Sequence, residues 1–445
     1  MRKIPGPHQI EAKDFLIKND GRVLVADPPG VGKTLSTVLY LEHLDQWPCL
    51  VVCPPAVLGH WKKEFEQQLP DRRAVIIRGE TLCEGDLLHD LVILNYDILD
   101  AQKPWLLEHQ YKCIIFDECD KLANKSTKWT QAAMVLAKHC PRVTGLSGTP
   151  IANRPADFYP ILNMIRPDLF GDEREFMWRY CQPQFHERYG WQFKGATKLQ
   201  ELHERIKPFM IRRPKSILNL PKQTIRMEFV DMENRETYNV LHKQYVGTVR
   251  TPSAFRKKGI DKLTLLSNLM MLCARCKARG TVMWIRKFLA ENPGEKLIVF
   301  AINKQFIDVI RRRAAEPHES MVIDGSTPAK KRDANVEAFQ TDPKVRLAII
   351  NIKAGGAGIT LTAAKTTVVA QLPWTPRDCE QLSGRTDRIT QTRENEVIYL
   401  LTKDTIEEKL CKAIEEKGRI QAAILDGKKV TNLNLMTLLE NSISE

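Results

Sequence analysis

The feature that most constrains this chain is the stretch from Val23 to Thr34, which reads Val-Leu-Val-Ala-Asp-Pro-Pro-Gly-Val-Gly-Lys-Thr. A short apolar run leads into a turn rich in proline and glycine, and the segment Leu35 to Leu44 that follows is typical of a helix. A strand, a tight loop and a helix N-terminus cradle phosphate, because backbone N–H groups and the helix dipole point at the anion. Lys33 can then reach the β- and γ-phosphates, and the Thr34 hydroxyl can bind Mg²⁺.

This loop departs from the standard phosphate-loop pattern at one position. Asp27 stands where that pattern has its first glycine, while Gly30 and Gly32 precede the Lys-Thr pair. The alternative interpretation is a chance glycine-rich turn before a helix. The apolar run before the loop and the helical segment after it favour phosphate binding, because this is the context in which such loops occur.

The charge balance indicates a polyanionic partner. The 445 residues carry a net charge of +13, a surplus that favours nucleic acid. Hydrophobic residues make up 43% and charged residues 27% of the chain, which is typical of a globular protein and argues against disorder. The length allows two or three domains.

Cysteine usage and the lack of long apolar runs predict a soluble protein inside the cell. The eleven cysteines are scattered, mostly in apolar runs, which fits a reduced compartment. Cys273 and Cys276 form the only close pair, and without a second pair or a histidine at ligand spacing we do not expect zinc. The N-terminus lacks the apolar segment of a signal peptide, and no apolar run approaches the roughly 20 residues of a membrane span.

Two carboxylates follow a predicted buried strand that begins at Cys113. Asp117 and Glu118 come at its carboxyl end, where open α/β sheets place ligand groups. We expect Asp117 to hold Mg²⁺ and Glu118 to orient or deprotonate the attacking water. An acidic pair at this place can also cap a helix, but together with Lys33 it indicates a catalytic site.

Other segments of the first half fit the same site. Gln9 precedes a helical segment and could either read the adenine edge with its amide or be a solvated residue at a helix start. Ser147 and Thr149 end a further strand and could couple the nucleotide site to a second surface. Apolar strands that alternate with helices predict a parallel, doubly wound α/β sheet.

The pattern becomes helical between Ala156 and Met271. Basic groups cluster at Arg212-Arg213-Pro-Lys215 and at Arg256-Lys257-Lys258. We expect most of them on solvated faces, and some could contact phosphates. Leu220-Pro221-Lys222 indicates a domain boundary, after which strands and helices alternate again.

The second half ends in a glycine-rich turn, an arginine pair and an amphipathic helix. The turn at 354–362 lets backbone approach a ligand closely. Arg385 and Arg388 share one face if this stretch is helical, and an arginine on a γ-phosphate is worth on the order of 10³–10⁵ in rate. A surface helix with two arginines is the alternative. The helix Thr405 to Ile420 is expected to pack on the second lobe.

In this order the motifs resemble those of the superfamily 2 helicase-like motors, and within them the Snf2 (SWI2/SNF2) family of DNA translocases. The resemblance covers nearly the whole chain, and the family also has Asp at the position of Asp27. The stretches similar to family motifs I, Ia, II, III, V and VI are Ala26–Thr34, Cys53-Pro54-Pro55 with Trp61, Asp117–Asp120, Leu146–Pro150, Lys353–Thr362 and Gln381–Gln391. Trp374-x-Pro376 and the helix from Thr405 are also family-like.

The resemblance implies two RecA-like lobes, each a mostly parallel sheet flanked by helices, with one ATP·Mg²⁺ in the cleft between them. Lobe 1 would comprise residues 1–220, with a helical insertion after about 155. Lobe 2 would comprise residues 221–445, with a helical insertion at about 232–290 and a C-terminal helix. The implied activity is a DNA-dependent ATPase that translocates along or remodels double-stranded DNA, including forked or branched DNA.

The resemblance also assigns roles to single residues. Catalysis would involve Glu118, Asp117, Lys33, Arg385 and Arg388, with Mg²⁺ on Thr34 and Asp117. The nucleotide would contact Gln9, Asp27, Gly30, Gly32, Lys33, Thr34 and Gly358. Coupling or nucleic-acid contact would fall to Pro54, Trp61, Ser147, Thr149, Gly355, Thr360, Trp374 and Gln381.

Several residues depart from the family pattern. Asp120 stands where Snf2 proteins usually have His, and Thr375 replaces the customary Asn. Asp387 and Thr390 stand where His and Gly are usual. These departures bear on the subfamily and on the coupling of ATP hydrolysis to movement, and they leave the ATPase core intact. The motor consumes the 445 residues, a compactness similar to bacterial and phage members. We therefore expect a monomer in a bacterial or phage-infected cell, or in the nucleus if eukaryotic, with partner proteins that supply targeting.

Two alternatives stay open from the sequence. A strand-separating DNA or RNA helicase is opposed by the helical insertion between Ala156 and Met271. A non-catalytic, nucleic-acid-binding nucleotide switch is opposed by Lys33, Glu118 and the two arginines, because a mere binder does not need a water-positioning carboxylate.

Overall fold

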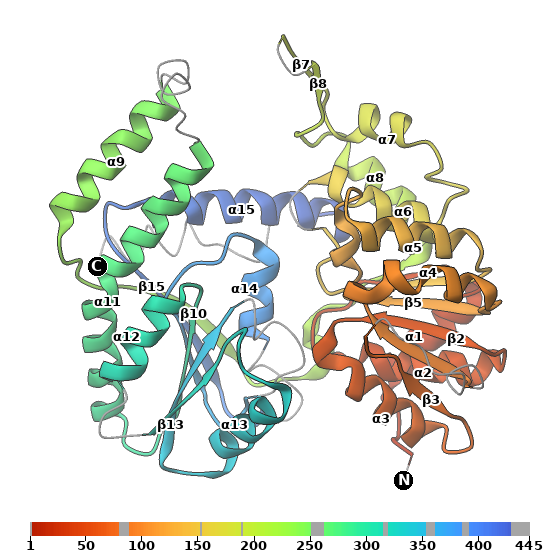
Figure 1. Ribbon diagram of the computed structural model, residues 1–445, viewed down its shortest axis with the longest axis horizontal. Helices are drawn as coiled ribbons and strands as arrows, with labels where there is room; N and C mark the ends of the chain where they lie inside the picture. Colours follow the sequence, from red (N-terminus) through yellow and green to blue (C-terminus); the bar gives the residue numbers. More distant parts are fainter. Residues whose placement is uncertain are drawn as a thin grey trace. The chain divides into compact units, whose positions relative to one another are not determined.

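The computed structural model separates the chain into two units (Figure 1). Unit 1 comprises Met1–Asn219 and Lys417–Asn432, and unit 2 comprises Leu220–Glu416 and Leu433–Glu445. The structure describes residues 2–79, 89–151, 154–187, 190–250, 262–314, 319–352, 361–384 and 391–428.

Unit 1 is built on a seven-stranded sheet with the strand order β3-β4-β2-β5-β6-β1-β9. Neighbouring strands in it pair in parallel. The strands are β1 (Leu24–Val25), β2 (Cys49–Cys53), β3 (Ala74–Ile76), β4 (Leu91–Asn95), β5 (Cys113–Asp117), β6 (Val143–Leu146) and β9 (Met210–Ile211).

Helices cover both faces of this sheet, and successive residues of a strand belong to two different buried cores, one on each face. On β2, Leu50 and Val52 belong to one buried cluster, whereas Val51 belongs to another. This alternation follows from the two-residue period of a strand, and apolar residues on both faces are typical of parallel sheets between helical layers. The helices of unit 1 are α1 (Pro7–Lys18), α2 (Lys33–Leu44), α3 (Leu58–Gln68), α4 (Leu99–Glu108), α5 (Lys128–Lys138), α6 (Tyr159–Ile165), α7 (Glu173–Tyr180) and α8 (Leu199–Ile206).

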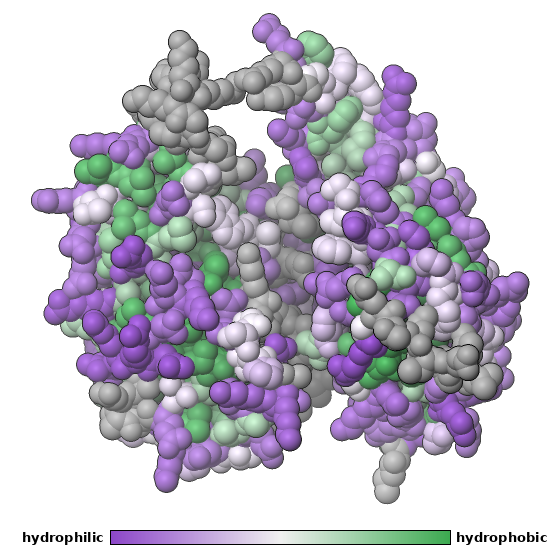
Figure 2. Space-filling model, viewed as in Figure 1, coloured by the Kyte–Doolittle hydropathy of each residue, from purple (hydrophilic) through white to green (hydrophobic). Residues whose placement is uncertain are grey.

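The helical stretch after residue 156 also contains a short antiparallel hairpin, which the sequence pattern did not predict. Its strands are β7 (Gln184–His186) and β8 (Gly190–Gln192). Phe185 and Trp191 lie opposite each other on it and are 64% and 50% exposed, so the hairpin carries apolar rings at the surface. Figure 2 shows apolar residues among the polar ones at this end of unit 1.

Unit 2 repeats the architecture with a six-stranded parallel sheet of order β10-β15-β14-β11-β13-β12. On β11, Ile298 and Phe300 face one core, and Leu297 and Val299 face the other. Its strands are β10 (Gln223–Phe229), β11 (Leu297–Ala301), β12 (Glu319–Ile323), β13 (Val345–Asn351), β14 (Thr366–Val369) and β15 (Asn395–Leu401). Its helices are α9 (Arg235–Arg250), α11 (Lys262–Glu291), α12 (Lys304–Ala314), α13 (Ala329–Thr341) and α14 (Pro376–Ser383).

The two parallel sheets confirm the predicted α/β fold class. The last helix is α15 (Ile406–Leu425), which the sequence predicts to pack on the second lobe. Its first turns join the core of unit 2, while Ile424 and Leu425 belong to a core of unit 1. His203 on α8 also hydrogen-bonds the Ile424 carbonyl at 2.8 Å.

Near the start of α15, unit 2 contains a buried ion pair. Lys277 on α11 is fully buried and donates to the Glu407 carboxylate and, at 2.9 Å, to the Leu400 carbonyl. The other Glu407 oxygen accepts the Thr402 N–H at 3.0 Å. The pair therefore fixes α15 against α11 and β15.

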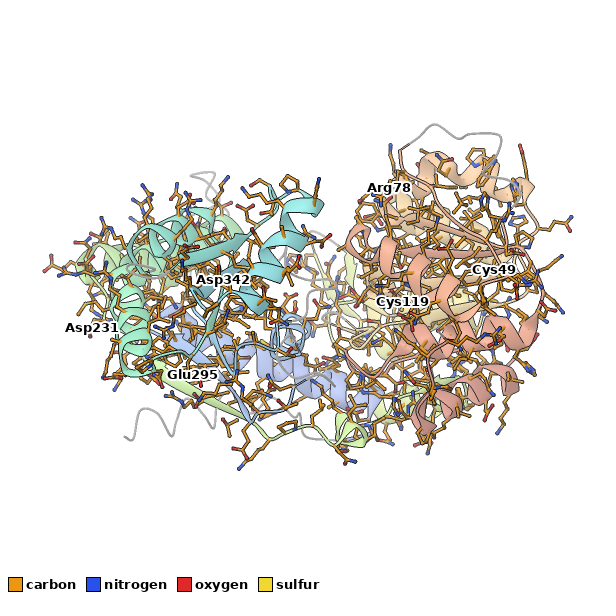
Figure 3. All side chains as sticks on the ribbon, turned by 90° about the horizontal axis from the view of Figure 1, so that it is seen from below. Cys49, Arg78, Cys119, Asp231, Glu295 and Asp342 are labelled. Carbon is orange, nitrogen blue, oxygen red and sulfur yellow. The ribbon has the colours of Figure 1, made fainter. Side chains whose placement is uncertain are left out.

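The cysteines in the described part of the chain are free and buried. Cys49 on β2 and Cys119 just after β5 are examples (Figure 3). Burial raises the pKa of both thiols well above the ordinary range. Among the described residues, no helix combines the length and apolar character that crossing a membrane requires.

Candidate active site

The glycine-rich loop lies between β1 and α2, as the sequence predicts. β1 pairs with β6 on one side and β9 on the other, so the loop leaves an inner strand of the sheet. Gly30 and Gly32 have φ angles of 92° and 91°, a left-handed conformation that favours glycine. Gly32 is the N-cap of α2, whose helical residues begin at Lys33. Backbone donors at this helix start are therefore available to an anion.

Lys33 lies over its own loop. Its Nζ donates to the Asp27 carbonyl at 2.8 Å and reaches the Pro28 carbonyl at 3.5 Å. Thr34, the next residue, is half-buried in the first turn of α2. Both side chains are thus placed at the helix start, where a bound phosphate and its cation would need them.

Gln9 packs against the same loop, so it is not a solvated residue. It lies in the first turn of α1, and its Oε1 accepts the Gly6 N–H at 2.9 Å, as in a capping box. A Cβ on Gly32 would collide with the Gln9 Nε2. Only 9% of Gln9 is exposed. The structure therefore brings the amide to the loop, and its contact with adenine stays a prediction.

Asp117 ends β5, and surrounding groups fix its carboxylate. The Trp61 indole N–H donates to Oδ2 at 2.8 Å, and the Glu118 N–H donates to Oδ1 at 3.0 Å. The Tyr96 hydroxyl donates to the Asp117 carbonyl at 2.8 Å. Burial and the neighbouring Glu118 raise the pKa of Asp117 to about 6, against the opposing effects of Trp61 and Lys33. A cation beside Asp117 would therefore stabilise the ionised form of its carboxylate.

Glu118 adopts a backbone conformation that is rare outside glycine. Its φ is 51° and its ψ is 51°, in the left-handed region. Such a conformation costs of order 1–3 kcal/mol and persists at functional sites when the surroundings hold it. The turn redirects the chain directly after the Asp117 strand end.

The donor set at this place fits Mg²⁺. Mg²⁺ prefers oxygen ligands from one or two protein groups and completes its shell with phosphate and water. Asp117 supplies a carboxylate whose pKa is raised by burial and by the charge of Glu118, and Thr34 supplies a hydroxyl at the start of α2. These two side chains would hold the ion.

Trp61 and Pro54, the residues of the stretch similar to motif Ia, are both buried in unit 1. Trp61 on α3 is fully buried, and its only polar group is the N–H that donates to Asp117. Pro54, which follows β2, is also buried. Both side chains are therefore buried within unit 1, and the coupling or nucleic-acid role of Pro54 and Trp61 stays a prediction. Trp61 also positions the predicted magnesium ligand.

The segment after β6 meets the loop and the acidic motif. The Ser147 hydroxyl donates to the Asp120 Oδ1 at 2.8 Å, and the Thr149 N–H donates to the Ser147 Oγ at 3.2 Å. A Cβ on Gly148 would lie 2.9 Å from the Pro29 Cδ, so glycine permits the close approach of this segment to the loop. The aspartate at position 120 thus has a function: it accepts the serine hydroxyl.

Asp27 and two arginines form a cluster that sequence reasoning missed. Arg212 and Arg213 follow β9 and were expected on a solvated or phosphate-binding surface. Instead Arg213 is 8% exposed and pairs with the fully buried Asp27. The Asp27 carboxylate is therefore directed at an internal arginine. A basic pair that directly follows an apolar stretch was the only hint in the sequence.

The predicted site residues of unit 2 are described only in part. Trp374 is 38% exposed, and Gln381 is half-buried on α14. Thr375 caps α14 by accepting the Asp378 N–H at 3.2 Å, so threonine replaces the customary asparagine in a role both can perform. The predicted residues Gly355, Gly358, Thr360, Arg385 and Arg388, the departures Asp387 and Thr390, and the cluster Arg256-Lys257-Lys258 lie outside the described residues.

Comparison with known families identifies the family of this chain. The SNF2-related domain matches residues 8–279, more than half of the chain. The chain belongs to the SNF2-related family. The helicase conserved C-terminal domain follows and matches residues 280–390. The SNF2 resemblance of the sequence motifs is thereby confirmed.

Curated SNF2 relatives match over most of this chain. The DNA annealing helicase and endonuclease ZRANB3 of Bos taurus is 28% identical over 440 residues, which cover 95% of this chain and 41% of the relative. The SWI/SNF-related matrix-associated actin-dependent regulator of chromatin subfamily A-like protein 1 homolog of Caenorhabditis elegans is 30% identical over 421 residues, which cover 92% of this chain and 60% of the relative. The chain thus spans about two fifths to three fifths of these SNF2 proteins.

Among solved structures, the Sulfolobus solfataricus SWI2/SNF2 ATPase core in complex with dsDNA is similar to this SNF2-related chain. It is 23% identical, with a TM-score of 0.46 and coverage of 98% of both chains.

Proposed function

We propose that this chain is an ATPase that couples ATP hydrolysis to movement along double-stranded DNA, or to its remodelling. The observation that carries the proposal is that Lys33 and Gln9 lie against one loop of unit 1, with Asp117 close enough to Lys33 for the two charges to interact. Membership of the SNF2-related family supports the same activity.

The residues of unit 1 have the roles that phosphoryl transfer needs. Such catalysis depends almost entirely on positioning and on neutralising negative charge. Lys33 would bind the terminal phosphates, and Mg²⁺ on Asp117 and Thr34 would supply further positive charge. Glu118 would orient the attacking water and accept its proton. We keep the prediction that Arg385 and Arg388 act on the same ATP.

The segment after β6 is suited to carry the state of the nucleotide away from the site. Gly148 lies against the loop, and the adjacent Ser147 hydrogen-bonds Asp120, three residues after Asp117. A change in the conformation of the glycine-rich loop on ATP hydrolysis would therefore shift Ser147 and Thr149. Gly355, Thr360, Trp374 and Gln381 remain proposed contributors to DNA contact and coupling.

Double-stranded DNA is the proposed partner for two reasons. The chain has a net charge of +13, which suits a polyanion. One of its relatives is named a DNA annealing helicase and endonuclease, a name that describes a protein acting on DNA. Forked or branched DNA belongs to the same proposed substrate class.

Triplex displacement tests this proposal, because a motor that tracks along a duplex removes a third strand without separating the other two. We expect ATP-dependent displacement by the parent chain and none by Lys33→Ala. Unwinding of a forked duplex without triplex displacement would indicate a strand-separating helicase instead. ATP binding without turnover, on any nucleic acid, would indicate a nucleotide switch.

A further inference from the structure

The arginine pair after β9 occupies the interior of unit 1 beside the phosphate loop. β9 pairs with β1 in parallel, at Leu24 with Met210 and Val25 with Ile211. Residues that follow both strands therefore leave the same edge of the sheet together. This placement brings Arg212 and Arg213 to the start of the loop, although about 186 positions separate them from it in the sequence.

Arg213 holds Asp27 by three donors. Its backbone N–H and its Nε donate to the Asp27 Oδ1 at 2.9 and 3.1 Å, and its Nη2 donates to the Oδ2. Asp27 is fully buried and Arg213 nearly so, and a buried ion pair is favourable only when such geometry is satisfied. The guanidinium therefore fixes the rotamer of Asp27 and the start of the loop.

The same guanidinium also holds α1. Its Nη1 donates to the His8 carbonyl and lies 3.4 Å from the Glu11 carboxylate. The His8 ring in turn hydrogen-bonds the Val31 carbonyl of the loop at 3.1 Å. Gln9, the next residue of α1, packs against Gly32. One side chain thus sets the distance between the phosphate loop and the glutamine proposed to contact adenine.

Asp27 passes this restraint to Lys33. The carbonyl of Asp27 accepts the Lys33 Nζ, while its carboxylate is held by Arg213. Side-chain and main-chain oxygens of one residue therefore join the internal arginine to the lysine proposed to bind phosphate. This explains why an aspartate can replace the glycine of the standard loop: its side chain is directed to Arg213.

Arg212 makes a parallel set of contacts. Its Nη1 donates to the Ala26 carbonyl at 2.8 Å and to the Gly148 carbonyl at 2.7 Å, and its Nε bonds Asp426 at 2.7 Å. The two consecutive arginines therefore hold neighbouring residues of the loop from within the domain.

We infer that Arg213 is a positioning residue of the nucleotide site, which sets the loop through Asp27 and the adenine side through His8. The inference rests on the proposed ATPase function. Arg213 then controls the affinity for nucleotide and the preference for adenine over guanine, whereas the cleavage step at saturating ATP depends on other residues.

The test compares Arg213→Gln with Asp27→Asn and the double variant. Fluorescent mant-ATP and mant-GTP are titrated with Mg²⁺, and steady-state ATP turnover is measured beside them. We expect Arg213→Gln to weaken mant-ATP binding at least tenfold, to lower the ATP-to-GTP affinity ratio at least fivefold, and to change kcat less than threefold. The double variant should lose no more mant-ATP affinity than the single variant with the larger loss, because both substitutions break the same Arg213–Asp27 interaction.

Arg142→Gln is the matched control. Arg142 is also a largely buried arginine of unit 1, and its Nε bonds Asp20 at 2.7 Å, but it precedes β6 and so lies at the opposite strand end from the loop. We expect its affinities and its ATP-to-GTP ratio to equal those of the parent.

Two results would overturn the inference: an unchanged affinity for mant-ATP, whatever happens to kcat, or an equal loss of affinity for both nucleotides. If Arg213→Gln does not fold, Asp27→Asn alone must show the loss of affinity, because the amide keeps the shape of the carboxylate. A parent chain that neither binds nor hydrolyses ATP would instead refute the proposed function. A parent that turns over ATP beside an unaffected Arg213→Gln variant would refute only this inference.

Discussion

Replacing Trp61 with phenylalanine should weaken the binding of Mg²⁺ with nucleotide. The substitution keeps an apolar ring in a fully buried position and removes the N–H that donates to the Asp117 carboxylate at 2.8 Å. A hydrogen bond to a charged group contributes about 1.5–3 kcal/mol, which corresponds to about tenfold to a hundredfold in an equilibrium constant. Because the bond is present with and without the cation, only the part of this energy that comes from orienting the carboxylate affects Mg²⁺ binding. The half-saturating Mg²⁺ concentration for ATP turnover should therefore rise severalfold, with this factor as the upper bound.

The effect should also depend on pH. The indole N–H lowers the pKa of Asp117, which burial and Glu118 raise to about 6. Without Trp61 this pKa rises further, so near pH 6 more of the carboxylate is protonated in the variant than in the parent. Near pH 8 both are ionised. The ratio of half-saturating Mg²⁺ concentrations, variant over parent, should therefore be larger at pH 6 than at pH 8.

Trp47→Phe supplies the control, because its indole N–H also donates to an aspartate, Asp45, at 2.9 Å, on an exposed surface. Its Mg²⁺ requirement should match that of the parent. The reasoning is refuted if Trp61→Phe needs no more Mg²⁺ than the parent, or if its excess requirement is the same at both pH values.

Three further perturbations probe other contacts. Gly32→Ala should abolish ATP binding in a titration, while circular dichroism shows that the fold survives. The reason is that the φ of Gly32 is 91° and that a Cβ would collide with the Gln9 amide. Wild-type affinity for ATP would contradict this. Ser147→Ala removes the 2.8 Å hydrogen bond to Asp120. It should reduce the stimulation of ATP turnover by DNA severalfold, with little change in turnover without DNA. A full stimulation by DNA would count against coupling through Ser147. Glu407→Gln leaves Lys277 buried without its counter-charge and should lower the free energy of unfolding in urea by roughly 3–5 kcal/mol. The double variant Lys277→Met/Glu407→Leu removes both charges and should lose far less. Equal losses of unfolding free energy would refute this.

The strand-loop-helix units were predictable because their information is local. The apolar strands β1 and β5 and the polar residues after them identify the loop at Lys33 and the carboxylate at Asp117. A parallel sheet then brings strand ends together without further assumptions. The same logic predicted the second sheet of the chain.

The roles of Trp61 and Arg213 were not predictable, because they depend on contacts far along the sequence. Trp61 bonds a residue 56 positions away, and Arg213 bonds one 186 positions away. Its charge predicts a surface position for Arg213, but the ion pair with the buried carboxylate of Asp27 stabilises it in the interior. The β7–β8 hairpin escaped prediction because its three-residue strands are too short for a visible period.

The most direct test of the proposed function is ATP turnover by the parent chain and by Glu118→Gln, with and without linear duplex DNA. We expect duplex DNA to stimulate the parent more than single-stranded DNA or RNA does. Loss of a general base typically costs about 10²–10⁴ in rate, so Glu118→Gln should bind ATP normally and turn it over slower by about that factor. Turnover that ignores duplex DNA, or that survives in Glu118→Gln, would contradict a DNA-coupled ATPase at this site.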